Sequence, residues 1–292
     1  PFPSAITPKL YGSIILNKKQ VEIVPTKYLK MILNSPVYDV AQETPLEAAP
    51  KLSDRLKNNI LIKREDLQSV FSFKIRGAYN KIAQLSPSEK KQGVIAASAG
   101  NHAQGVALAA AKLKISATIV MPETTPDIKI EGVKRFGAKV ILFGDDFSTA
   151  FEKAQELSVQ KSLVFIPPFD DPLVIAGQGT IALELLRQYT KDIYAIFIPI
   201  GGGGLISGIG SYLRFVWPSI NVIGCSPKNS AVMIHSIMKG EILKMESKPT
   251  ISDGTAGGVE SDSITFPVCC EIIDDLVLLT ENQIKNAMLS YI

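Results

Sequence analysis

The chain has few of the residues that build metal centres and disulfide frameworks. It contains three cysteines and two histidines among 292 residues, with no Cys-x-x-Cys pair, so the usual zinc-ligand spacings are missing. Cys269 and Cys270 are neighbours, and consecutive Cα atoms lie about 3.8 Å apart, which is too short for an ordinary disulfide. We therefore expect no metal site, no bridge between these two cysteines and a reducing compartment.

Net charge and long apolar runs are also scarce. The formal charge is +3, and basic residues are mixed with acidic ones along the chain, which gives no basic patch for nucleic acid or a membrane surface. No apolar run reaches the roughly 18 residues needed to span a bilayer, and the N-terminus lacks both a starting Met and a signal pattern. The sequence predicts a soluble, cytoplasmic globular protein with trimmed first residues, and an organelle matrix is the alternative.

What the chain does have is a regular alternation of apolar and helical segments. Strands are expected near 93–97, 117–121, 139–143, 163–166, 193–200, 221–225 and 276–279. Helices are expected near 103–113, 126–136, 147–160, 173–189, 205–215 and from 281 onward. Such alternation predicts an α/β fold with parallel sheets and right-handed crossovers.

The remaining segments are less regular. Four prolines in residues 1–26 predict an irregular arm. Residues 27–33 and 44–56 are expected to be helices and 59–64 a strand, while the composition of 247–265, rich in Gly, Ser, Thr and Asp, predicts a loop.

Lys74 stands at a place that suits chemistry. It follows Phe71-Ser72-Phe73 and opens a predicted helix through Ile82. An amine partly buried there has a lowered pKa, and such a lysine can form a Schiff base with a carbonyl. Because Lys and Arg together number 31, the alternative is an ordinary solvated surface lysine.

Four consecutive glycines, residues 201–204, connect a predicted strand to a predicted helix. Without Cβ atoms, successive N–H groups can face one point, and the positive end of the following helix favours an anion. Neither the Walker A spacing nor the dinucleotide-binding spacing occurs here. We therefore expect a small phosphorylated ligand, with a flexible turn as the alternative.

A second strand-to-helix turn comprises Ser98, Ala99, Gly100, Asn101 and His102. Ligand sites of α/β sheets gather at such turns, and its N–H groups and short polar side chains suit a carboxylate. The alternative is that Ser98 or Asn101 simply caps the helix. A phosphate loop, an imine-forming lysine and a carboxylate-binding turn together suggest pyridoxal phosphate acting on an amino acid.

Several motifs in a fixed order support this interpretation. They are Lys63-Arg64-Glu65-Asp66-Leu67-Gln68, Ser72-Phe73-Lys74-Ile75-Arg76-Gly77-Ala78, Ser98-Ala99-Gly100-Asn101-His102-Ala103-Gln104-Gly105, Pro167-Pro168-Phe169-Asp170, Ala176-Gly177-Gln178-Gly179-Thr180 and Gly201-Gly202-Gly203-Gly204-Leu205. Over about residues 28–245 the chain resembles the threonine dehydratase (threonine deaminase) family.

The resemblance implies a fold-type II pyridoxal phosphate enzyme, similar to the tryptophan synthase β-subunit, with two three-layer αβα domains and mostly parallel sheets. A large domain of residues 1–86 and 172–292 would hold a small inserted domain of residues 87–171. The residues that would bind the cofactor are Lys74, Phe73, Asn101, Gly201, Gly202, Gly203, Gly204 and Leu205. The residues that would bind the substrate carboxylate are Ser98, Ala99, Gly100, Asn101 and His102.

The activity that the resemblance implies is elimination of water from threonine to give 2-oxobutyrate and ammonia. Residues 28–46 resemble the isoleucine-biosynthetic branch, whereas 252–260 look more like a broader serine/threonine dehydratase, so serine and other β-hydroxy amino acids stay open as substrates. Related serine racemases carry a serine at the position of Ala99, so Ala99 favours elimination over racemisation. β-Replacement of the cysteine synthase type and non-catalytic ligand binding stay open as well.

Two further expectations follow from the resemblance. Ser226 stands where many relatives have a metal-binding glutamate, so we expect no cation there. A Ser/Cys-Gly-x-Asn motif that contacts the cofactor's pyridine nitrogen, and any regulatory domain, would lie beyond Ile292. The family is usually dimeric or tetrameric, so a homodimer or homotetramer is expected.

Overall fold

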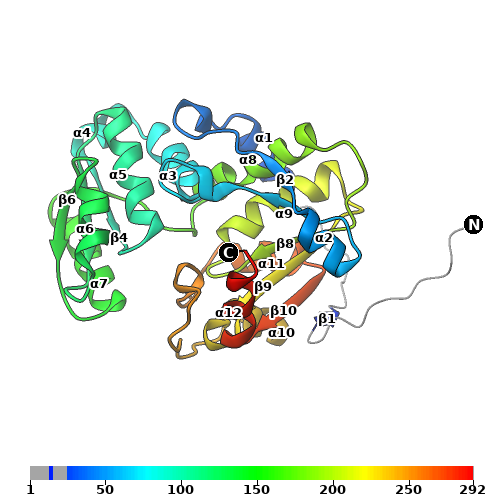
Figure 1. The fold of residues 1–292 in the computed structure, drawn as a ribbon. Coiled ribbons are helices and arrows are strands. Elements are labelled where there is room, and N and C mark those ends of the chain that lie inside the picture. Colours follow the sequence, from blue (N-terminus) through cyan, green and yellow to red (C-terminus); the bar gives the residue numbers. More distant parts are fainter. Residues whose placement is uncertain (1–12, 16–24, 292) are drawn as a thin grey trace, which may run out of the picture.

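The computed structural model describes residues 13–15 and 25–291, which form two four-stranded sheets, one two-stranded sheet and their covering helices (Figure 1). The strand orders are β6-β5-β4-β7 in the first large sheet, β1-β10-β9-β8 in the second, and β2-β3 in the small one.

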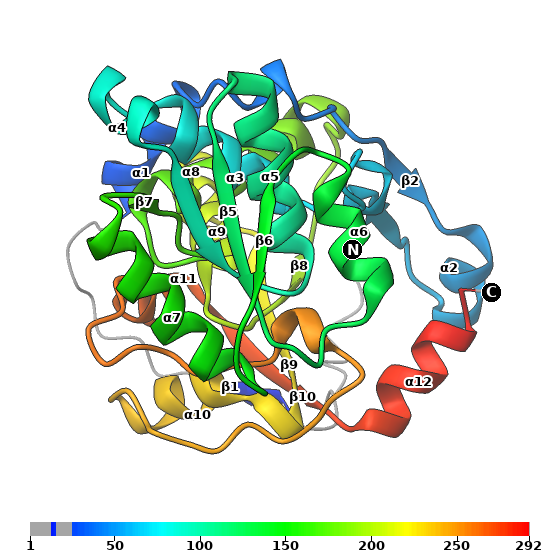
Figure 2. The ribbon, with the colours of Figure 1, turned by 90° about the vertical axis from the view of Figure 1, so that its left-hand side faces the viewer.

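The first large sheet is parallel throughout. Its strands are β4 (Val94–Ala97), β5 (Ala117–Met121), β6 (Lys139–Leu142) and β7 (Val164–Phe165), and the helices beside them are α4 (Pro87–Gln92), α5 (Asn101–Leu113), α6 (Asp127–Lys134) and α7 (Phe147–Gln160). All four residues of β4 are buried. Val94 and Ala96 pack in one apolar cluster with residues of α5, whereas Ile95 and Ala97 pack in another with residues of α7. The sheet is therefore covered on both faces, as Figure 2 shows.

The second large sheet carries the predicted glycine loop. Its strands are β8 (Ala195–Pro199), β9 (Asn221–Pro227), β10 (Asp275–Leu279) and β1 (Ser13–Ile15), and its neighbouring helices are α1 (Pro25–Leu33), α8 (Pro172–Gln188), α9 (Gly204–Val216), α10 (Val232–Lys239) and α11 (Thr265–Ile272). β8, β9 and β10 pair in parallel, and β1 pairs antiparallel with β10. One cluster of buried hydrophobic residues from α1, α8, α9, α10, α11 and the strands forms the core here.

The helix that begins at Lys74 lies between the two large sheets (Figure 1). The remaining elements are α2 (Pro50–Leu56), α3 (Lys74–Ala83), α12 (Glu281–Leu289), β2 (Leu46–Ala48), β3 (Leu61–Lys63) and the short 3-10 helices η1 (Val37–Asp39), η2 (Glu65–Leu67), η3 (Lys228–Ser230) and η4 (Asp253–Thr255). A Cβ added at Gly105 of α5 would lie 3.2 Å from the Lys74 carbonyl carbon, and one at Gly177 of α8 would lie 2.6 Å from the Arg76 carbonyl oxygen. Glycines thus let α5 and α8 approach the first turn of α3 closely.

The predicted α/β architecture with mostly parallel sheets is confirmed, and each strand expected after residue 87 is present. The helix expected over 44–56 was wrong, because β2 occupies Leu46–Ala48 and α2 begins only at Pro50. A helix running through Pro50 would have placed a residue without an N–H group in its interior.

Three other segments differ from the expectation. The short helix α4 was not predicted. The arm over 1–26 was expected to be irregular, but 13–15 form β1 and α1 already starts at Pro25; residues 1–12 and 16–24 lie outside the described part. The loop expected over 247–265 contains η4 and ends at Thr265, where α11 begins.

Within the described part of the chain, no helix combines the length and the apolar character that crossing a bilayer requires.

Candidate active site

Residues 166–170, which connect β7 to α8, contact all three predicted motifs. The ring of His102 is hydrogen-bonded through Nε2 to the Ile166 carbonyl at 2.8 Å. Lys74 Nζ donates to the Pro168 carbonyl at 2.8 Å. The ring of Phe169 fills the space beside Gly202, where an added Cβ would lie 2.3 Å from a ring carbon. Because Pro168 and Phe169 are consecutive, the amine of Lys74 and the glycine loop both contact one dipeptide.

The amine of Lys74 has an unusual environment for a lysine. Nζ lies 5.5 Å from the centre of the Phe73 ring, and among the described residues it forms no ion pair. Burial lowers the pKa of this amine from 10.5 to about 8, because the protein around it solvates the ammonium form poorly. This placement contradicts the alternative of an ordinary surface lysine and suits attack on a carbonyl.

The four glycines lead from β8 into α9, and neighbouring atoms pack closely against them. Gly203 is the N-cap residue with φ of +85°, and no side chain caps the helix. An added Cβ would lie 2.8 Å from the Thr255 carbonyl oxygen at Gly201 and 2.9 Å from Cys269 Sγ at Gly203. Neighbouring atoms therefore fix the loop, which contradicts the flexible-turn alternative. The free N–H groups of an uncapped helix end attract an anion, so the loop fits the phosphate of pyridoxal phosphate.

The second turn is also an uncapped helix start. Gly100 is the N-cap residue of α5, and no side chain caps this helix. Ser98 Oγ accepts a hydrogen bond from the Gly100 N–H at 3.1 Å, and Asn101 is exposed as the first residue of the helix. Neither Ser98 nor Asn101 caps α5 with its side chain, although Ser98 does satisfy the N–H of Gly100, and the first N–H groups of the helix itself are left for a carboxylate.

His102 lies in the same turn, but its ring is bound to the backbone of the protein itself, at the Ile166 carbonyl. The residue is buried. Burial and, to a smaller extent, the charge of Lys74 lower the pKa of His102 to about 3. The ring is thus neutral, and Nε2–H donates to the Ile166 carbonyl because that oxygen can only accept. The ring fixes the segment that holds Lys74, while any contact with a substrate carboxylate falls to the His102 backbone.

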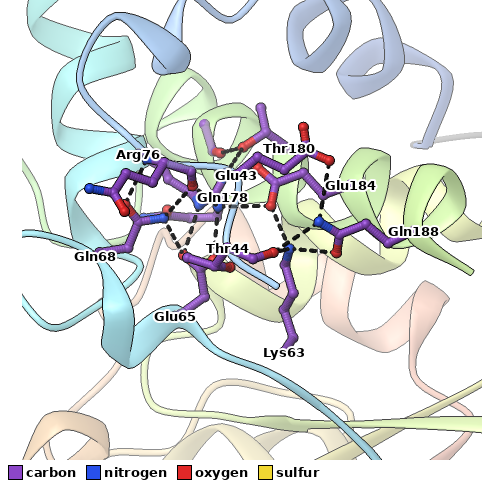
Figure 3. Close-up of polar contacts among 12 residues, drawn as sticks. Glu43, Thr44, Lys63, Glu65, Gln68, Arg76, Gln178, Thr180, Glu184 and Gln188 are labelled. Carbon is purple, nitrogen blue, oxygen red and sulfur yellow. Dashed lines mark hydrogen bonds and ion pairs between the residues drawn. The ribbon is translucent and has the colours of Figure 1, made fainter. Parts of the chain in front are cut away.

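A buried network of charges surrounds Arg76, two residues beyond Lys74 (Figure 3). Arg76 is completely buried, and its guanidinium donates to Glu184 Oε1 at 2.5 Å and to both carboxylate oxygens of Glu65 at 2.8 Å. Lys63 Nζ lies 2.6 Å from Glu184 Oε2, and Thr44 Oγ1 donates to Glu65 at 2.6 Å.

This network positions the helix that carries Lys74. Burial alone would lower the pKa of Arg76, but the carboxylates of Glu65 and Glu184 raise it above its ordinary value. Glu65 lies in η2 and Glu184 in α8, so the first turn of α3 is tied to two separate elements. Glu65 and Arg76 stand in motifs of the sequence, but Glu184 does not, and its contacts could not be foreseen because Arg76 and Lys63 are 108 and 121 positions away.

Ser226, at which we expect no cation, bonds only to the backbone. Its Oγ donates to the carbonyls of Ile200, at 2.9 Å, and Ser230, at 3.2 Å. Among the described residues, no group of three or more His, Cys, Asp and Glu side chains is placed to hold a metal ion.

A family model described as "Pyridoxal-phosphate dependent enzyme" matches residues 37–292. The chain belongs to this family. Membership confirms the fold-type II class and the pyridoxal phosphate cofactor that the motifs predicted. In this structure, Lys74 and the glycine loop fit the cofactor, and the uncapped start of α5 fits the carboxylate of an amino acid.

Several curated proteins with a similar sequence are threonine dehydratases. The threonine dehydratase of Nicotiana attenuata is 52% identical over 262 residues, which are 90% of this chain and 43% of that protein. The mitochondrial threonine dehydratase of Saccharomyces cerevisiae is 47% identical over 288 residues, 98% of this chain and 49% of that protein. The chain thus spans about half the length of the curated relatives it matches.

Solved structures give the same picture. Processed threonine deaminase isoform 2 from Solanum lycopersicum superposes with a TM-score of 0.88 at 50% identity, covering 94% of this chain and 80% of that chain. Maize serine racemase superposes with a TM-score of 0.85 at 32% identity, covering 89% of this chain and 79% of that chain.

We expect the amine of Lys74 in the cofactor-free protein to react as an unprotonated nucleophile from about pH 8. Since its pKa is lowered from 10.5 to about 8, the amine is protonated below pH 8 and free above it. Competitive acetylation followed by peptide mass spectrometry gives the midpoint, with Nα-acetyllysine in the same tube as the reference. A midpoint for Lys74 that coincides with the reference would contradict this assignment.

Glu184→Ala should destabilise the fold strongly. The substitution removes the acceptor of Arg76 and Lys63 and leaves the buried guanidinium short of one partner, which costs about 3–5 kcal/mol. Urea unfolding measures the loss. Glu47→Ala is the matched control, because Glu47 pairs with Arg64 at the surface and its removal should cost much less. An equal decrease in the free energy of unfolding in the two variants would contradict a stabilising role of the buried network.

Proposed function

We propose that the full-length protein is a pyridoxal phosphate-dependent threonine ammonia-lyase. It converts L-threonine to 2-oxobutyrate and ammonia by β-elimination of water, as the first step of isoleucine biosynthesis. The observation that carries this proposal is that the Lys74 amine and the glycine loop contact the same dipeptide, Pro168-Phe169. The 50% identity to tomato threonine deaminase supports it.

In this proposal Lys74 binds the cofactor covalently, and the N–H groups of Gly201 to Gly204 and Leu205 hold its phosphate. Phe73 lies against the cofactor ring, and Asn101 bonds the ring oxygen. When bound, pyridoxal phosphate supplies an electron sink for the substrate Cα. Lys74 Nζ takes the Cα proton as a general base, and burial, which lowers its pKa, favours the unprotonated form that this step needs.

The turn from Ser98 to His102 binds the substrate carboxylate through the uncapped start of α5. Ala99 offers no hydroxyl proton on the face opposite Lys74. A proton returned to Cα from that face would invert the amino acid, so a methyl group at this position favours elimination. Serine is the second candidate substrate, because residues 252–260 resemble the broader serine/threonine dehydratases. Thr255 of this segment packs on Gly201.

The organisation of the whole protein is part of the same proposal. In it, residues 87–171 form the small domain, and 1–86 with 172–292 belong to the large one. One buried cluster, with residues from Val37 to Ile166, contains residues of α3 as well as residues of the small domain. Helix α3 would therefore join the two domains. We expect a homodimer or homotetramer in the cytoplasm or in an organelle matrix. The names of similar proteins include both mitochondrial and chloroplastic forms.

Activity of the full-length protein tests the function. Threonine should yield 2-oxobutyrate, measured with lactate dehydrogenase and NADH, and Lys74→Ala should lower kcat by a factor on the order of 10³. Lys112→Ala, an exposed lysine on α5, is the control and should keep full activity.

Serine is assayed in parallel, and a higher kcat/KM for serine than for threonine would favour the second candidate. Cysteine formation with sulfide and no oxo acid would favour β-replacement. Tight cofactor binding with no turnover of either amino acid would contradict an enzymatic role.

A further inference from the structure

Two side-chain hydroxyl groups donate hydrogen bonds to backbone carbonyls in and next to the glycine loop. Thr265 Oγ1, at the start of α11, donates to the Gly202 carbonyl at 2.6 Å. Ser226 Oγ, on β9, donates to the Ile200 carbonyl at 2.9 Å. Both side chains are buried. The loop is therefore fixed by hydrogen bonds from two other elements as well as by the packing of its glycines.

The bond from Thr265 decides how one peptide group of the loop is oriented. In a trans peptide the carbonyl and the following N–H point in opposite directions. Because Thr265 holds the Gly202 carbonyl on its own side, the N–H of Gly203 must point to the other side. Glycine has wide conformational freedom, so without this bond the peptide between Gly202 and Gly203 would be free to turn its carbonyl toward an anion.

Thr265 is itself held by Ser263 and Asp170. Ser263 Oγ lies 2.8 Å from Thr265 Oγ1 and 2.7 Å from Asp170 Oδ1, and the Thr265 N–H donates to the same carboxylate oxygen at 3.2 Å. The Gly202 carbonyl can only accept, so the hydroxyl proton of Thr265 goes to it, and the proton of Ser263 is left for Asp170 or Thr265. Asp170 follows Phe169, which packs on Gly202, so the chain of contacts returns to the segment that holds Lys74.

We propose that Thr265 is a positioning residue for the cofactor phosphate. Its hydroxyl keeps the Gly202 carbonyl away from the phosphate and the Gly203 N–H turned toward it, and Ser263 and Asp170 fix the hydroxyl. The proposal rests on the placement of the phosphate at Gly201 to Gly204.

The experiment compares Thr265→Val, which keeps the shape and removes the hydroxyl, with Thr265→Ser, which keeps the hydroxyl. Apoprotein of the full-length chain is titrated with pyridoxal phosphate and, separately, with pyridoxal, which has no phosphate. Thr265→Val should raise the Kd for pyridoxal phosphate roughly tenfold, as expected when a buried carbonyl loses its donor. Thr265→Ser should stay near the wild type, and the Kd for pyridoxal should be unchanged in both.

Two further variants keep the result interpretable. Thr118→Val, on β5 in the other large sheet, is the matched control and should not change either Kd. Ser263→Ala removes the hydroxyl that joins Thr265 to Asp170 and keeps the Thr265 hydroxyl itself. It should weaken pyridoxal phosphate binding in the same direction but less, which preserves the test if Thr265→Val does not fold. The ³¹P resonance of the bound cofactor should shift in Thr265→Val and not in Thr265→Ser.

The outcomes distinguish an error in the placement of the phosphate from an error in the role of Thr265. If the wild type binds pyridoxal as tightly as pyridoxal phosphate, the placement of the phosphate at the glycine loop is wrong. If the wild type prefers pyridoxal phosphate and Thr265→Val keeps the whole preference, only the role of Thr265 is overturned. A weaker binding of both ligands by the same factor would also overturn it, because that pattern indicates a general structural effect.

Discussion

The hydrogen bond from Lys74 to the Pro168 carbonyl is the contact on which the site depends. It joins the amine to a short backbone segment that also binds the His102 ring, packs on the glycine loop and, through Asp170, reaches Thr265. Because Pro168 contacts the amine and Phe169 contacts the loop, covalent geometry limits the distance between the two. A neutral acceptor also leaves the pKa of Lys74 lowered, whereas a carboxylate would have raised it.

Two residues in the first turn of helix α3 have different neighbours: Arg76 is bound to carboxylates, and Lys74 is not. Glu65 and Glu184 are bound to Arg76 and Lys63, so their charges are neutralised by these two cations. Lys74, two residues earlier, has aromatic and backbone neighbours. The ion pairs hold the helix in place, and the lack of a paired carboxylate at Lys74 among the described residues keeps its amine reactive. Position and reactivity of the lysine therefore come from different neighbours.

Local features could be predicted from the sequence, and long-range ones could not. The buried strand Val94–Ala97, the glycine loop and Lys74 all have their signal within a few consecutive residues. The strand Leu46–Ala48 was mistaken for a helix because its partner lies across α2, and Pro50 was the one local signal against that helix. The bonds of Asp170 and Gly202 to Thr265 join residues 95 and 63 positions apart, and neither end has a pattern that reveals the other.

The central claim is that Lys74 and the glycine loop hold opposite ends of one pyridoxal phosphate molecule. A crystal structure of the full-length protein with its cofactor tests this claim most directly. The account predicts continuous density from Lys74 Nζ, through the cofactor ring beside Phe73, to a phosphate bound by the N–H groups of Gly201 to Gly204. A cofactor attached to another lysine, or a phosphate bound away from these four glycines, would contradict it.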